Sequence, residues 1–294
     1  MIQALALIRA RLGPAALEEA IRTGSAGVVL ERALADAALE TAFAPVRQEL
    51  QRTLADNVAY FAHDVPVRGA LRGVAIAFDV LNPRVIDAVR RLDTRVFMRL
   101  AEDVRGTVRQ VVERGLAQGV GPRTIARGLR DVVGLAPNQE AAIHNFERML
   151  REGDRAALTR ALRDHRFDRT LDRLLGVRGE GLSAAQVTRM TDAYRRNMVA
   201  FNAESNARTA ALNSVKLGQR LSWQDAIDKG YVDGGNLMKR WVNVGDARVR
   251  DEHLAQPLGV AGETVPFDEP YSTGEMEPGD DTYNCRCLSF VFAG

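Results

Sequence analysis

Cysteine is almost absent from this sequence of 294 residues. The two cysteines, Cys285 and Cys287, stand one residue apart, and a bridge between such close neighbours would be strained. The chain therefore lacks the paired cysteines of a disulfide-stabilised secreted fold, and nothing indicates an oxidising compartment.

Long apolar runs and a leader segment are also missing. No stretch approaches the ~18 apolar residues of a membrane-spanning helix, so we expect no membrane partner. Met1–Ile8 is apolar, but no basic segment precedes it and Arg9 and Arg11 interrupt the run that follows, unlike a signal peptide. We expect a soluble protein made in a cytoplasm.

Aromatic residues make up only 6% of the chain, whereas Ala, Leu, Val and Arg are abundant, which favours helices over an all-β fold. The hydrophobic fraction of 46% is enough for a core, and the length suits one large domain or two ordinary ones. Lysine is scarce. Only Lys216, Lys229 and Lys239 occur among 40 basic residues, which codon bias in a GC-rich genome explains as well as any arginine-specific chemistry.

Charge is unevenly distributed although the net charge is only +2. Residues 241–294 hold ten acidic and three basic side chains, and the rest of the chain holds 28 acidic and 37 basic ones. This asymmetry predicts a basic body followed by an acidic C-terminal domain. Glycine-rich phosphate loops and nucleophile elbows are absent, so nucleotide binding and serine hydrolase chemistry are unsupported.

Apolar periodicity and helix-breaking residues predict a mainly helical chain. The clearest helix is 85–119, and Ser183 with Gln186 forms a capping-box pattern that starts a long helix running toward Leu217. A last helix is expected from Trp223 to Lys229. Further helices are expected over 2–12, over 14–22, over 28–60 with interruptions near Pro45, and over 155–175. Two more are expected between them, one ended by Gly134 and one that begins at Pro137.

Beyond Gly230, repeated glycines and prolines break the chain into short segments, and 240–244, 264–267 and 285–292 are the strand candidates. We predict a mainly α protein with a small C-terminal α+β domain, an elongated helical body followed by a compact Gly/Pro-rich domain. The expected parts are N-terminal helices over 1–64, a helical body over 65–181, and a long helix leading into the C-terminal domain over 182–294.

A metal site is the most specific chemistry that the C-terminal residues suggest. If 241–253 folds as strand, turn and helix, Asp246, Arg250 and His253 share one helix face. If the chain end is a strand, Cys285 and Cys287 share one face of it, with Arg286 opposite. An imidazole and two thiols, with Asp246 or Asp251 as fourth ligand, would form a tetrahedral zinc site.

Two other interpretations of these residues stay open. The thiols can simply be buried, because free cysteine is among the most buried residue types, with His253 a core residue hydrogen-bonded to Asp246. The acidic residues of this region can also include a catalytic carboxylate pair, although acidic loops are usually only solvated.

Several spaced residues of unusual type carry a family resemblance. They are Trp241, Asp246, Arg248, Arg250, His253, the Phe267–Pro270 turn, Pro278, Gly279, Asn284, Cys285, Arg286 and Cys287. This pattern resembles that of the phage Mu F-like head morphogenesis proteins, also called minor capsid or minor head proteins. Upstream, Ala207–Thr209, Asn213 and Gly230 fit the family's entry to this domain, so the resemblance covers about 207–288.

The resemblance implies a structural, non-enzymatic virion component. Such proteins associate with the portal, and with major capsid or scaffold protein, inside the head near the portal vertex of a tailed phage or phage-like particle. They are made in the host cytoplasm and aid head assembly, DNA packaging or delivery. Non-specific DNA contact is compatible with the basic body, and no small-molecule substrate or membrane is expected.

Two rival functions remain as alternatives. The first is a metal-dependent hydrolase or nuclease, with an open position on the metal and Asp251 or Glu252 as general base. The second is an effector carried in the head and ejected with the genome.

Overall fold

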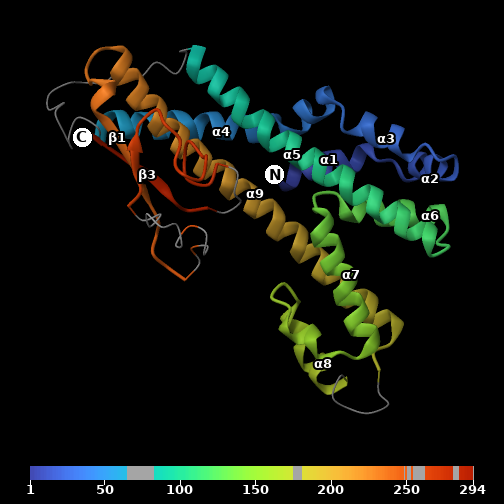
Figure 1. Cartoon of the computed structure of the whole chain (residues 1–294). Coiled ribbons are helices and arrows are strands. Elements are labelled where there is room, and N and C mark those ends of the chain that lie inside the picture. The colour runs from blue at the N-terminus through green and yellow to red at the C-terminus, as the bar shows by residue number, and fades with distance from the viewer. Residues whose placement is uncertain are drawn as a thin grey trace. The chain divides into compact units, whose positions relative to one another are not determined.

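The computed structural model describes residues 1–64, 83–174, 181–247, 249, 253, 262–280 and 285–293. These residues form a mainly helical protein with a small antiparallel sheet near the C-terminus, which confirms the predicted fold class (Figure 1). No helix within these ranges is both long enough and apolar enough to cross a membrane.

The elements follow one another in a simple order. The α-helices are α1 (Ile2–Arg11), α2 (Pro14–Arg22), α3 (Ala26–Ala33), α4 (Asp36–Asp64), α5 (Pro83–Ala117), α6 (Pro122–Val132), α7 (Pro137–Glu152), α8 (Asp168–Leu174) and α9 (Ala184–Asp228). Short 3₁₀ helices cover Arg155–Thr159, His165–Phe167 and Gly234–Asn236. The strands are β1 (Leu237–Val242), β2 (Thr264–Pro266) and β3 (Leu288–Ala293).

Proline and capping residues set several helix boundaries. The helices α2, α5, α6 and α7 all begin with proline, whose fixed φ suits the first helical position. The predicted capping box of α9 is present. The backbone N–H of Ser183 donates to Gln186 Oε1 at 2.8 Å, and that of Gln186 donates to Ser183 Oγ at 3.3 Å.

Three helix predictions differ from the structure. The break expected near Pro45 falls earlier, between α3 and α4, and Pro45 lies inside α4. The helix that begins at Ala184 runs without a stop to Asp228, so the two expected helices are one, since no residue between them breaks it. Within 155–174, two 3₁₀ turns precede the short α8. The segment 64–84 lies almost wholly outside the described residues.

The chain divides into two compact units, each built from two stretches of sequence. Unit 1 holds Met1–Ala44 with Phe97–Glu204, and unit 2 holds Pro45–Val96 with Ser205–Gly294. The boundaries of these units differ from those of the three consecutive parts expected from the sequence. The three-part division stays a prediction.

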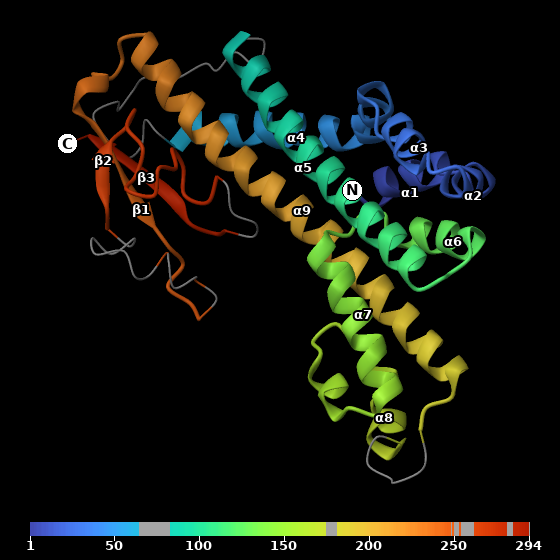
Figure 2. The same cartoon turned by 45° about the vertical axis from the view of Figure 1, so that its right-hand side comes forward.

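Unit 1 is a helical assembly around α7 and the first part of α9, which lie side by side (Figure 2). The rings of Phe146 and Tyr194 stack between them with centroids 4.3 Å apart. Asn202 links the helices to the preceding loop, because its Nδ2 donates to Gly134 O at 2.6 Å and its Oδ1 accepts from Gln139 Nε2 at 3.0 Å.

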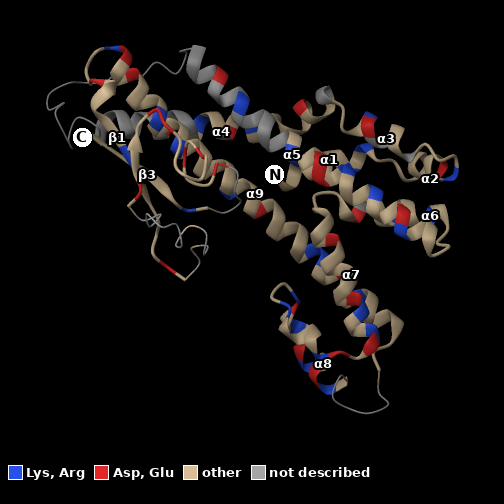
Figure 3. Cartoon of the chain, in the orientation of Figure 1, with Lys and Arg blue, Asp and Glu red and all other residues tan. Residues whose placement is uncertain are grey.

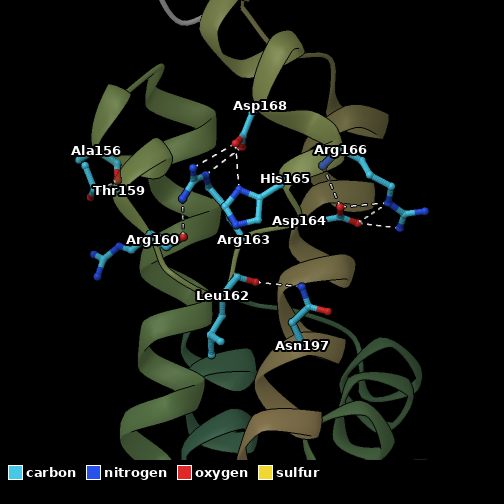
Figure 4. A network of polar contacts seen from close by, with 10 residues as sticks. All are labelled: Ala156, Thr159, Arg160, Leu162, Arg163, Asp164, His165, Arg166, Asp168 and Asn197. Carbon is cyan, nitrogen blue, oxygen red and sulfur yellow. Dashed lines mark hydrogen bonds and ion pairs between the residues drawn. The ribbon is translucent and has the colours of Figure 1, made fainter. Parts of the chain in front are cut away.

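The surface of unit 1 carries interleaved charges, visible along α6 and α7 (Figure 3). The segment between α7 and α8 shows how these charges pair (Figure 4). Arg163 binds the Asp168 carboxylate through two nitrogens at 2.8 and 3.0 Å, and His165 Nδ1 lies 3.0 Å from the same carboxylate. The hydrogen bonds from Arg166 hold the pKa of Asp164 to about 2. The Arg163–Asp168 pair is part-buried, whereas exposed pairs such as Arg148–Glu152 on α7 contribute little to stability.

Unit 2 contains the sheet, in the order β2-β1-β3 with both pairs antiparallel. Alternate residues of β1 point to opposite faces, so Leu237, Lys239 and Trp241 are buried while Arg240 and Val242 are exposed. Leu237 packs with Phe267 and Val291, and this cluster is covered by Trp223 and Ile227 of α9 together with Val232.

Candidate metal centre

The two cysteines are placed by the segment that leads into β3. The strand begins at Leu288, so the prediction that Cys285 and Cys287 lie within a strand is wrong by a few residues. The alternation expected of a strand still holds, because Cys285 and Cys287 are buried, at 4% and 3% exposed, and Arg286 between them is not. The chain therefore directs both thiols to the same side.

His253 meets both thiols there, as the sequence predicted. The side chain of His253 is buried, and its Nδ1 lies 3.7 Å from Cys285 Sγ and 3.6 Å from Cys287 Sγ. The three ligand atoms all lie within 4.8 Å of one another, so the cluster could hold a metal ion.

The spacing of these atoms fits a tetrahedral zinc ion. Bonds of about 2.3 Å to sulfur and about 2.05 Å to nitrogen at the tetrahedral angle require a nitrogen–sulfur separation of about 3.6 Å. The two measured separations match that value. Thiol–imidazole hydrogen bonds span a similar distance, so the distances alone do not identify a metal site. The ligand types add a second argument, because thiolates and imidazole together prefer zinc to magnesium or calcium.

Asp246 does not join this group. Its Oδ1 accepts a hydrogen bond at 2.6 Å from Nη2 of Arg286, the residue between the two cysteines. The four-ligand set predicted from the sequence is therefore reduced to His253, Cys285 and Cys287 within the described chain. The expected helix from Asp246 to His253 lies largely outside the described residues, as do Arg248, Arg250, Asp251 and Glu252.

Electrostatics within the cluster favour one thiolate. The thiol of Cys287 donates to Cys285 and lowers the pKa of Cys285 to about 6, helped by the ammonium of Lys216 and by His253. The same hydrogen bond, together with burial, raises the pKa of Cys287. One sulfur is thus prepared as an anionic ligand, and the second would lose its proton when a metal binds.

Aromatic rings enclose the cluster. Trp241 is fully buried and meets His253 and Tyr271 edge to face, with centroids 5.3 and 5.0 Å away. Together with the two cysteines, Trp241 and Tyr271 form one buried core, against which Val265 packs. The Trp241 N–H makes no hydrogen bond of ordinary geometry among the described residues, and its interaction with Cys287 favours the thiolate of that cysteine. Such an outer contact supports a sulfur ligand.

Two buried lysines hold the loop that covers the sulfurs, and no sequence pattern predicted that they would be buried there. Lys216 of α9 donates to the carbonyl oxygen of Pro278, and Lys239 of β1 donates to that of Met276 at 2.6 Å. Both side chains are fully buried. The scarcity of lysine could have identified them. In this arginine-rich chain, two of the three lysines occupy enclosed sites that fit a compact ammonium group.

Glu277, in the same loop, is a further buried charge that sequence reasoning missed. Its Oε2 accepts from Ser289 Oγ at 2.5 Å, and its Oε1 lies 3.7 Å from Arg220 Nη1. Ser289 is also within hydrogen-bond distance of the Tyr271 hydroxyl, at 2.9 Å. Burial raises the pKa of the Glu277 carboxyl despite its cationic neighbours, Lys239 and Arg220.

This raised pKa predicts a pH-dependent stability with a defined sign. The native state holds the Glu277 proton more tightly than the unfolded chain, so the free energy of unfolding should fall as pH rises from the ordinary value of 4.5 through the folded pKa. The Glu277→Gln variant mimics the protonated carboxyl and should lack this decrease. Urea unfolding across that pH range measures it, with exposed Glu269→Gln as control. Identical pH profiles for the wild type and Glu277→Gln would contradict the assignment.

Comparisons of the chain with protein-family models, curated proteins and solved structures find no match. Several residues of the recognised pattern are nevertheless close together in the structure. Trp241, His253, Cys285 and Cys287 are in mutual contact, and Gly279 lies against Cys285. Asn284, like Arg248 and Arg250, is outside the described residues.

Proposed function

We propose that this chain is a non-enzymatic minor head protein of a tailed phage or phage-like particle. The observation that carries the proposal is that four residues of the family resemblance, Trp241, His253, Cys285 and Cys287, pack together in one buried cluster. Burial of this degree suits residues whose role is to hold the fold together. A catalytic centre needs a path by which its substrate reaches it, and the low exposure of His253, Cys285 and Cys287 favours a structural role instead.

Zinc in this cluster would act as a structural cross-link. His253 is separated from the cysteines by 32 and 34 residues, so one ion bound by all three would close a long loop of chain. The sheet that these residues adjoin has only three short strands. A domain with so small a core gains stability from a metal.

The charge distribution supports contact with the portal through the helical body. Residues 1–240 have nine more basic than acidic side chains, which suits an acidic protein surface or DNA phosphates at salt-sensitive affinity. In this proposal the protein is made in the host cytoplasm and enters the head near the portal vertex, where it also adjoins the major capsid or scaffold protein.

Particle assembly tests the proposal. The full chain, expressed with the head genes that accompany it, should co-purify with particles in a few copies and cross-link to the portal protein. A chain lacking Met1–Gly176, with its folding checked by circular dichroism because the deletion also removes Pro45–Val96 of unit 2, should be excluded. Purified particles free of the full chain would overturn the proposed function, whereas normal incorporation of the truncated chain would remove only the assignment of docking to the helical body.

A second candidate, a zinc-dependent hydrolase or nuclease, is favoured by one observation. The three described ligands leave a tetrahedral zinc ion one position to fill, as in catalytic sites. Zinc-dependent cleavage of DNA or of cell-wall substrate that disappears in the His253→Ala variant would support this candidate. Absence of cleavage by protein with a full complement of zinc would exclude DNA and cell wall as its substrates.

A further inference from the structure

Among the described residues of unit 2, one face of the sheet, its outer face, exposes several large apolar side chains around Arg240. Val242, Leu288 and Phe290 are 44%, 40% and 46% exposed. Val242 pairs with Leu288 in the β1–β3 register, and Phe290 stacks on Phe292 with ring centroids 5.9 Å apart. Leu288, Phe290 and Phe292 therefore present apolar side chains along β3 that a further strand paired with β3 would contact.

β3 is also an edge strand. The sheet order β2-β1-β3 leaves one side of β3 without a neighbouring strand in the described chain. The six residues Leu288–Ala293 carry no charge. Natural proteins usually protect such edges with lysine, proline or a bulge, because an unprotected edge templates pairing with another chain.

We infer that β3 pairs with β3 of a second copy of this chain, in antiparallel orientation, so that two three-stranded sheets become one of six strands. A two-fold axis at Phe290 keeps the alternation of both strands in phase. Phe290 then lies opposite Phe290 of the second copy, and Leu288 lies opposite Phe292. Cross-strand pairs between aromatic and large apolar side chains stabilise antiparallel sheets.

Charge selects this edge pairing over stacking of the two outer faces. Arg240 lies in the middle of the outer face, with its guanidinium 5.1 Å from the centroid of the Phe292 ring. Face-to-face stacking would bring the two arginines together in an apolar interface. Edge pairing separates their strands by three strand spacings, about 14 Å, which exceeds the screening length of about 8 Å at physiological ionic strength.

The mass of the full-length protein in solution tests this inference, which does not depend on the proposed function. Sedimentation velocity from micromolar to near-millimolar concentration should show a monomer–dimer equilibrium. The Phe290→Lys variant should raise the dimer dissociation constant at least about tenfold, because it removes the central aromatic pair and opposes two ammonium groups. Val244→Lys, at a residue 51% exposed and beyond the end of β1, is the matched control and should dimerise normally.

Hydrogen exchange of the wild-type protein gives a second measurement that needs no variant. The amides of Leu288–Ala293 should exchange more slowly as concentration rises. A protein that stays monomeric, a dimer that Phe290→Lys leaves intact while folded, or exchange of these amides that is independent of concentration would each overturn the inference.

Discussion

Replacing Gly279 with alanine should destabilise unit 2 by about 3 kcal/mol or more and disrupt the cluster of His253, Cys285 and Cys287. Gly279 has a φ of +76°, and a Cβ added there would lie 2.2 Å from Cys285 Cβ and 2.4 Å from Cys285 Sγ. The two buried lysines hold the Gly279 loop, and Cys285 is itself buried, so the clash is costly to relieve. Thermal and urea unfolding of the full chain measure the loss.

Gly274→Ala separates backbone strain from this contact. Gly274 lies in the same loop with a φ of +83°, but a Cβ there would meet nothing within 4 Å. Its variant should lose only the cost of the left-handed backbone, about 1 kcal/mol. Equal losses for the two glycine variants would show that Gly279 does not pack against the cysteine as described.

Removing zinc should have the second large effect. If zinc is present at about 1,000 times its dissociation constant, its removal lowers the free energy of unfolding by about 4 kcal/mol. A strong chelator should therefore lower the melting temperature of the wild-type protein. Cys285→Ser should melt at that lowered temperature already and should not respond to chelator, because it lacks one of the three ligands.

Asp246→Asn provides the control, and it also tests the ligand set expected from the sequence. Since the Asp246 carboxylate pairs with Arg286 at the surface, this variant should respond to chelator as the wild type does. A wild-type protein that is insensitive to chelator would contradict a metal-stabilised fold. Loss of the response in Asp246→Asn would restore Asp246 as a ligand.

The sequence predicted that both cysteines would meet His253 partly because alternation along an extended chain is a local property. Cys285 and Cys287 had to face the same side whether or not β3 had begun. The choice of His253 rested on helical spacing and on the ligand chemistry of imidazole, and the structure brings its ring to the two sulfurs. The error about Asp246 arose because helical spacing shows which residues share a face and not which cation lies nearest.

The supporting residues could not be located from sequence alone. Lys216, Lys239 and Glu277 are buried through contacts between segments far apart in the chain, and charged side chains are ordinarily expected at the surface. Helix boundaries also differed in how well local sequence predicted them. Those with a proline or capping box were predicted closely, whereas the break expected after Leu217 is absent because Gly218 alone does not end α9.

X-ray absorption at the zinc edge, on full-length protein purified without added metal, tests the central claim most directly. The account predicts about one zinc ion per chain with two sulfur ligands at about 2.3 Å and imidazole nitrogen in the same shell. A folded protein without zinc, or zinc bound only through nitrogen and oxygen, would contradict the claim that His253, Cys285 and Cys287 hold this domain together.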